Sequence, residues 1–165
     1  MPEENERPLV VVGVDGSDHA TVALRRALHE AARRGARVLA VAAWERPPVT
    51  LEAYYGMPLD DAVTDARVHE QRTRAVVDAV RASEPALADV PVEVEAVAGH
   101  AGAALVERAR GADLLVVGHR GRGGLASVAL GSVGLSCVLH APCPVLVVPM
   151  TSTATPEPAT AGAAR

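Results

Sequence analysis

The chain has 165 residues, of which 49% are apolar and 22% are charged, and its net charge is −4. This length and composition fit one globular domain with a sizeable core, and they exclude a chain that is disordered throughout. All sixteen basic residues are arginine. Mechanisms that need a lysine, such as a Schiff base or the P-loop, are therefore excluded. The sequence also lacks the basic stripe typical of nucleic-acid binders, so no nucleic-acid partner is expected.

Two features of the sequence bear on location. Residues 1–8 are acidic and contain no apolar signal region, and the two cysteines form neither a disulfide framework nor a metal set. We therefore expect a reducing, cytoplasmic compartment. The stretch between Gly123 and Glu157 lacks Asp, Glu and Arg, but glycines and serines dilute it and the prolines at 142 and 144 divide it. It is interpreted as a helix, a turn and a strand, with no membrane partner.

Residues 9–14 form a continuous apolar run, LVVVGV, which is typical of a strand covered on both faces of a parallel sheet. Ser17 or Asp18 can cap the helix that follows, and Gly35 ends it. The remaining predicted elements, in chain order, are a strand over 37–44, a loop over 45–58, a helix over 60–83, an edge strand over 90–98, a helix over 101–110, a strand over 114–118, a glycine-rich loop over 119–126, a helix from 132 and a strand over 145–148.

This alternation predicts an α/β fold in which helices cover both faces of an open parallel sheet. Residues 9–150 form a single domain in this interpretation. Residues 1–8 are expected to be a flexible N-terminus, and residues 151–165, which have little to bury, a disordered tail.

Two strand ends carry residues suited to binding chemistry. One is the turn Gly13-Val14-Asp15-Gly16-Ser17, and the other is the segment from Gly118 to Gly124, followed by Gly131-Ser132. Ligands of open parallel sheets bind beyond the carboxyl ends of strands, where the strand order reverses. Glycines let backbone N–H groups approach a phosphate, and a helix beginning at Ser132 favours an anion at its N-terminus.

Each of these residues also has a purely structural interpretation. Asp15 can accept hydrogen bonds from a ribose hydroxyl or hold a divalent metal through water, but it is equally suited to a turn. The glycines also fit a plain mobile loop, although their number beside a predicted strand and helix weakens that alternative. Arg120 and Arg122 can neutralise phosphate charge or remain solvated.

The sequence resembles the universal stress protein family from about Pro8 to Pro149. The nucleotide signature of that family is Gly, two residues, Gly, nine residues and Gly-Ser or Gly-Thr, and here it falls on Gly118, Gly121 and Gly131-Ser132. The segment DLLVVGHRGRGGL and the ending APCPVLVVP are also typical of the family. The resemblance implies a five-stranded sheet in the order 3-2-1-4-5, of the Rossmann-like, adenine nucleotide alpha hydrolase-like type.

Members with this signature bind ATP, so the resemblance implies ATP with Mg²⁺ or Mn²⁺ as the ligand. Asp15 would lie near the ribose or the metal, and Arg120 is a candidate for phosphate charge. The remaining binding residues that the resemblance and the motifs indicate are Gly13, Val14, Ala43, Val117, Gly118, Gly121, Gly131, Ser132 and Val133. At 42 and 43 the chain has two alanines where the family often has His-Val, so adenine would pack more loosely.

The resemblance also implies a homodimer formed through the last strand, Val145 to Val148, which is an apolar edge. An ATP-binding regulatory or stress-response protein is the leading interpretation of the sequence. Two alternatives stay open: a slow ATPase or self-phosphorylating protein, and a dimeric scaffold that nucleotide stabilises. For the enzyme, no residue is clearly placed as a general base, and His119, Ser127 and Ser132 are the nearby candidates for phosphate chemistry.

Overall fold

The computed structural model describes residues 7–45, 62–120 and 130–150. The tail, most of the N-terminal segment predicted to be flexible and most of the predicted glycine-rich loop lie outside these ranges. Within them, no helix has both the length and the hydropathy that crossing a bilayer requires.

Five parallel strands form one sheet, as predicted. They are β1 (Leu9–Gly13), β2 (Arg37–Trp44), β3 (Val92–Ala98), β4 (Leu114–Gly118) and β5 (Val145–Val148). Their order is β3-β2-β1-β4-β5, so β1 lies between β2 and β4. Strands β2 and β3 extend the sheet on one side of β1, and strands β4 and β5, which come later in the chain, extend it on the other side. The strand order therefore reverses at β1 and β4, and their carboxyl ends adjoin.

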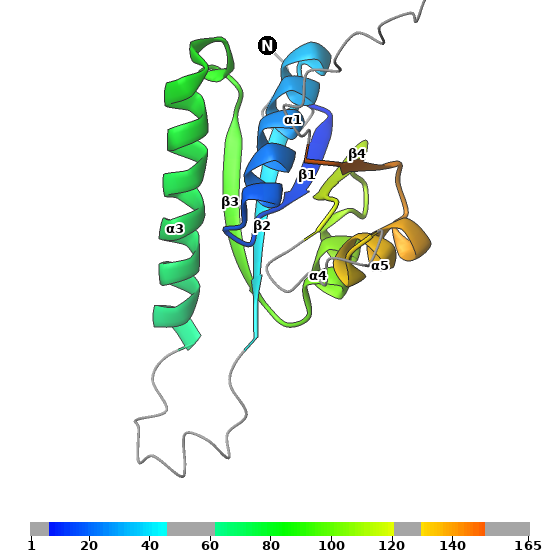
Figure 1. The fold of residues 1–165 in the computed structure, drawn as a ribbon. Helices are drawn as coiled ribbons and strands as arrows, with labels where there is room; N and C mark the ends of the chain where they lie inside the picture. Colours follow the sequence, from blue (N-terminus) through cyan, green and yellow to red (C-terminus); the bar gives the residue numbers. More distant parts are fainter. Residues whose placement is uncertain (1–6, 46–61, 121–129, 151–165) are drawn as a thin grey trace, which may run out of the picture.

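Helices cover both faces of this sheet (Figure 1). The helices α1 (Asp18–Arg34) and α3 (Ala62–Ser83) pack on one face, where they enclose the larger hydrophobic cluster. The helices α4 (Ala101–Arg108) and α5 (Ser132–His140) pack on the other face, over the smaller cluster. A short 3-10 helix, η2 (Pro85–Leu87), joins α3 to the β3 side of the sheet.

The ends of α1 follow from the cap residues found in the sequence. The Ser17 hydroxyl accepts a hydrogen bond from the Ala20 N–H at 3.1 Å, which satisfies one of the helix's unpaired donors. Gly35 closes the helix in the left-handed conformation, with φ at 63°. Ser17 is thus the cap, rather than Asp18, and the predicted bounds of this helix are confirmed.

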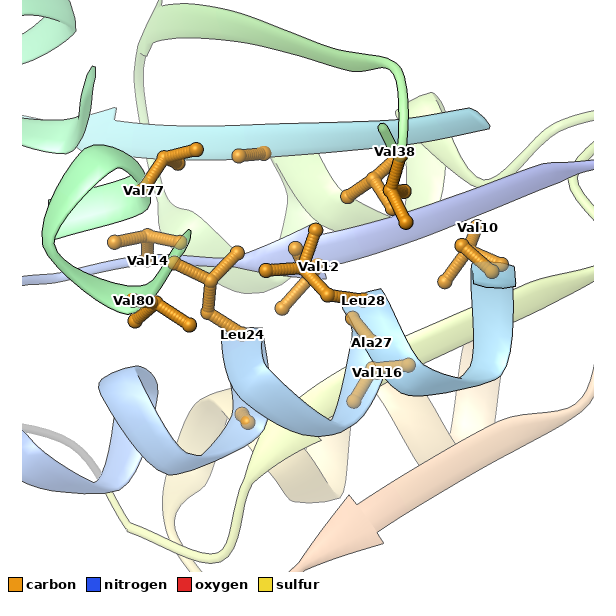
Figure 2. Packing of buried hydrophobic residues seen from close by; sticks show 14 of the residues in the cluster. Val10, Val12, Val14, Leu24, Ala27, Leu28, Val38, Val77, Val80 and Val116 are labelled. Atoms are coloured by element: carbon orange, nitrogen blue, oxygen red, sulfur yellow. The ribbon is translucent and has the colours of Figure 1, made fainter. Parts of the chain in front are cut away.

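The core is built from small aliphatic side chains, as a chain without phenylalanine requires. Val10 and Val12 of β1 are fully buried and face Leu24 and Leu28 of α1 (Figure 2). Alanines such as Ala27, also fully buried, bring the helix close to the strands. Close-packed small residues of this kind fix α1 firmly over β1 and β4.

Some boundaries differ from the sequence prediction for local reasons. β3 begins at Val92, not at 90, because Pro91 has no N–H to donate, although its carbonyl accepts from the Val38 N–H at 2.8 Å. α4 ends at Arg108 rather than 110, shortly before Gly111, which has a φ of 77°. The η2 turn was not predicted, since three residues are too few to produce a periodic pattern.

Candidate nucleotide-binding site

The candidate site lies at the carboxyl ends of β1 and β4. These strands pair in parallel, with Val12 opposite Val116, so the segments that follow them leave the sheet side by side. The turn after β1 carries Asp15, and Gly118 ends β4. The structure therefore brings together the two motifs that lie about a hundred residues apart in the sequence.

Gly118 packs directly against the backbone at the start of α1. A Cβ at this position would lie 2.9 Å from the carbonyl oxygen of His19 and 3.0 Å from its carbonyl carbon. Backbone atoms of a helix packed on the sheet cannot move aside cheaply, so any side chain here forces β4 and α1 apart. Glycine at this position keeps the two backbones in contact under the candidate site.

The N-terminus of α5 lies beside the end of β4. Its N-cap, Gly131, donates from its backbone N–H to the His119 carbonyl at 3.0 Å, and His119 donates to the Val148 carbonyl at 2.8 Å. These bonds tie the start of α5 to the ends of β4 and β5. The first N–H groups of a helix have no intrahelical acceptor, and the helix dipole adds partial positive charge there. Together they can hold an anion such as phosphate.

Asp15 serves the turn after β1 in this structure. One of its carboxylate oxygens, Oδ1, accepts from the Ser17 N–H at 2.9 Å, and Gly16 follows with a φ of 78°. This is the turn role that the sequence left open for Asp15. The side chain is exposed, so the turn role is compatible with a ligand contact as well.

The other predicted residues are placed as follows. The Val14 side chain is buried in the core between α1 and α3, and its N–H donates to Val41 at 2.9 Å (Figure 2). Val117 is likewise buried, so a ligand contact with either valine would use the backbone. Ala43 is half-buried on β2, next to the last residue of that strand.

Five further candidates complete the predicted set, and four of them lie within the described residues. Gly13 ends β1 and packs against the Leu105 side chain, 2.9 Å from where a Cβ would stand. Ser132 is exposed and Val133 half-buried in the first turn of α5. Arg120 is half-buried just after β4. Gly121, like Arg122 and Ser127, lies outside the described residues.

Sequence reasoning missed His19 as part of this site. Its backbone forms the surface on which Gly118 rests, because the first turn of α1 crosses the end of β4. The only sequence signal is the glycine itself, which indicates a close backbone approach without identifying the partner.

A divalent metal would depend on few protein ligands here. Among the described residues there is no group of three or more His, Cys, Asp or Glu side chains that could hold one. Mg²⁺ is usually held by one or two carboxylates together with substrate phosphates and water. Asp15 is the carboxylate in the turn after β1 that fits that pattern.

Comparison with known proteins identifies the class. A profile of the Universal stress protein family matches residues 8–149. The chain therefore belongs to the universal stress protein family. A Thermus aquaticus protein described as a universal stress protein in the QAH/OAS sulfhydrylase 3′ region is 38% identical over 142 residues, which cover 84% of this chain and 96% of that protein.

Two further matches support this assignment. The Mycobacterium tuberculosis universal stress protein Rv2005c is 34% identical over 148 residues, and the match covers 89% of this chain but 47% of Rv2005c. The chain thus spans about half the length of that relative. A solved universal stress protein in complex with cAMP is 29% identical, with a TM-score of 0.61, and the match covers 86% of this chain and 97% of that one.

Proposed function

We propose that this protein is a cytoplasmic regulatory protein of the stress response that binds ATP together with a divalent cation. The observation that carries the proposal is the convergence of the β1 turn, the end of β4 and the N-terminus of α5 on one place. Contact between Gly118 and the His19 backbone, and the bond between Gly131 and His119, hold that arrangement. The structure solved with cAMP, a related adenine nucleotide, adds support.

In this proposal backbone groups make most of the contacts with the nucleotide. The N–H groups at the start of α5 and the Ser132 hydroxyl hold the phosphates. Asp15 faces the ribose or holds Mg²⁺ or Mn²⁺ through water, and the backbone at Ala43 meets the adenine. The bound cation and helix dipole offset phosphate charge where a P-loop protein has a lysine.

Gly131→Leu tests this site with little risk to the fold. Gly131 has φ −65° and ψ 157°, a conformation open to any residue, so the new side chain covers the start of α5 without straining the backbone. We expect the dissociation constant for Mg-ATP, measured by isothermal titration calorimetry, to rise at least about tenfold, a loss of about 1.4 kcal/mol.

The matched control is Ala32→Leu. Ala32 is exposed near the end of α1, at the opposite end of the sheet, so the same side chain is added away from the site. Its affinity for Mg-ATP should equal that of the wild type. Unchanged affinity in Gly131→Leu would show that the phosphates bind elsewhere, even if the protein binds ATP.

We also propose that two copies pair through β5. This strand is one edge of the sheet, and all four of its residues are only half-buried. The adjacent surface of α5 exposes Leu135, Val138 and Leu139, the last to 65%. An unpaired strand edge beside an exposed apolar helix surface is suited to a symmetric contact with a second copy.

A further inference from the structure

A hollow lies far from the candidate nucleotide-binding site. It encloses about 480 Å³ at the amino-terminal ends of β2 and β3, and its wall includes Arg37, Arg74 and Glu93. The eight residues of β2 separate it from the carboxyl ends of the strands, a distance of about 25 Å. Its volume falls within the range of small-molecule sites.

Two guanidinium groups give the hollow its chemistry. Arg37 begins β2, and its side chain is half-buried, with 23% of its surface exposed. Arg74 reaches the hollow from the exposed side of α3. Pro91, Val92 and Val94 complete the wall with apolar surface. Weakly hydrated arginines beside apolar surface are suited to bind an oxyanion, because the guanidinium fork matches phosphate and carboxylate oxygens.

Arg37 differs from the other paired arginines in how poorly its charge is matched. Its closest carboxylate is that of Glu93, 3.7 Å from Nη1, and the Glu93 side chain is 69% exposed. By comparison, Arg108 lies 2.7 Å from Glu95, and Arg110 lies 2.8 Å from Glu107. The Arg37 Nε is buried without a hydrogen-bond partner among the described residues, a state that it shares with the Nε atoms of Arg25 and Arg81.

A half-buried guanidinium with an unpaired N–H and a distant carboxylate is incompletely compensated, so an anion that supplies further acceptors gains free energy on binding. Glu93 opposes this gain with its negative charge, and Arg74 adds to it. We propose that this hollow is a second ligand site, distinct from the nucleotide-binding site, for a small oxyanion, either a phosphate or a carboxylate group carried on a partly apolar molecule.

The test follows the side-chain Nε–H resonance of Arg37 by ¹⁵N NMR during separate titrations with inorganic phosphate and acetate at constant ionic strength. We expect this resonance and the amides of Val92 and Val94 to shift in a saturable way. Saturation by phosphate assigns a phosphoryl ligand, and saturation by acetate assigns a carboxylate ligand.

Variants give effects of opposite sign. Arg37→Gln and Arg74→Gln should each weaken binding at least about fivefold, whereas Glu93→Gln should tighten it by removing the competing carboxylate. Arg74 is exposed on α3, so its variant keeps the fold even if Arg37→Gln disturbs β2. Arg72→Gln, an exposed change on the same helix outside the hollow, should leave affinity unchanged.

Four results would overturn the proposal. One is the absence of saturable shifts around Arg37 with either anion. A second is equal binding by the wild type and Arg74→Gln, and the third is weaker binding by Glu93→Gln. Shifts confined to the start of α5 would also overturn it, because they would place the phosphate in the nucleotide-binding site.

Discussion

At the scale of single residues, the candidate nucleotide-binding site depends on how closely backbones approach. Gly118 leaves no room for a Cβ, since His19 backbone atoms stand 2.9 and 3.0 Å from where it would lie. Gly134, in α5, also has a close neighbour, but that neighbour is the Leu130 side chain at 2.8 Å, which can rotate away. The two glycines therefore differ in what a methyl group would displace.

This difference predicts unequal costs for two alanine variants. Gly118→Ala should lower the free energy of unfolding by about 1–3 kcal/mol and weaken nucleotide binding, because β4 and α1 must separate. Gly134→Ala should cost less, since alanine favours the helix and Leu130 can yield. Urea denaturation of both variants measures the difference. Equal stability of Gly118→Ala and the wild type would contradict the close contact.

The two cysteines predict slow thiol chemistry. Burial raises the pKa of Cys137 to about 11, and it raises the pKa of Cys143 as well. At pH 8 Cys137 is therefore almost entirely a thiol rather than a reactive thiolate, and the raised pKa of Cys143 also favours its thiol form. Reaction with Ellman's reagent should be slow in the folded protein, slower for Cys137, and fast in denaturant. Rapid reaction of Cys137 in the native state would contradict its burial.

At the scale of secondary-structure elements, much of the fold could be predicted from the sequence. The runs at Leu9–Gly13 and Leu114–Gly118 are continuously apolar because both faces of these strands are covered. Ser17 and Gly35 set the ends of α1 through local chemistry that a short segment contains by itself. Signals of this kind do not depend on distant parts of the chain.

Features that depend on distant segments could not be predicted from the sequence. The glycine spacing indicated a phosphate site, but not that His19 would support it or that the Val14 side chain would turn into the core. The ion pair between Arg37 and Glu93 also depends on the register of β2 and β3, which places Leu39 opposite Glu93. Register and packing arise from the whole sheet.

The ion pair between β3 and α4 gives a prediction about pH. Arg108 binds both carboxylate oxygens of Glu95, at 2.7 and 2.8 Å, and holds the pKa of that carboxyl below its usual value of 4.5. Its stabilisation is fully present above pH 4.5 and is lost as the pH falls through the lower pKa of the folded state.

Glu95→Gln should therefore lower the free energy of unfolding by about 1 kcal/mol at pH 7, since both partners are partly exposed. The difference from the wild type should shrink as the pH falls below 4.5. Glu107→Gln, in a pair that is largely exposed, serves as the control and should change little. Urea denaturation across this pH range checks both, and a difference that does not depend on pH would contradict the assignment.

At the scale of the whole molecule, the sheet has two different edges. Helix α3 packs against β3, whereas β5 lies beside the exposed apolar residues of α5. The proposed pairing through β5 would cover this second edge. It would not cover the candidate nucleotide-binding site, which lies at the carboxyl ends of β1 and β4. Each copy would then carry its own site.

Leu139→Glu tests that pairing without touching the core, because the Leu139 side chain is 65% exposed. Placing a charge on an apolar contact is costly unless it is paired, so the variant should shift the protein from dimer to monomer in light scattering after size exclusion. Val68→Glu, an exposed apolar position on α3, is the control and should remain dimeric. A monomeric wild type, or a dimer unaffected by Leu139→Glu, would contradict the pairing.

The most direct test of the central claim is a ¹⁵N NMR titration of the wild-type protein with Mg-ATP. The backbone amides of Gly13, Gly118 and Ser132, contributed by β1, β4 and α5, should shift together and saturate at one common dissociation constant. They should do so because one ligand lies across all three segments. Mg-ATP that leaves these three amides unmoved at saturating concentration would contradict the claim that this place in the fold binds nucleotide.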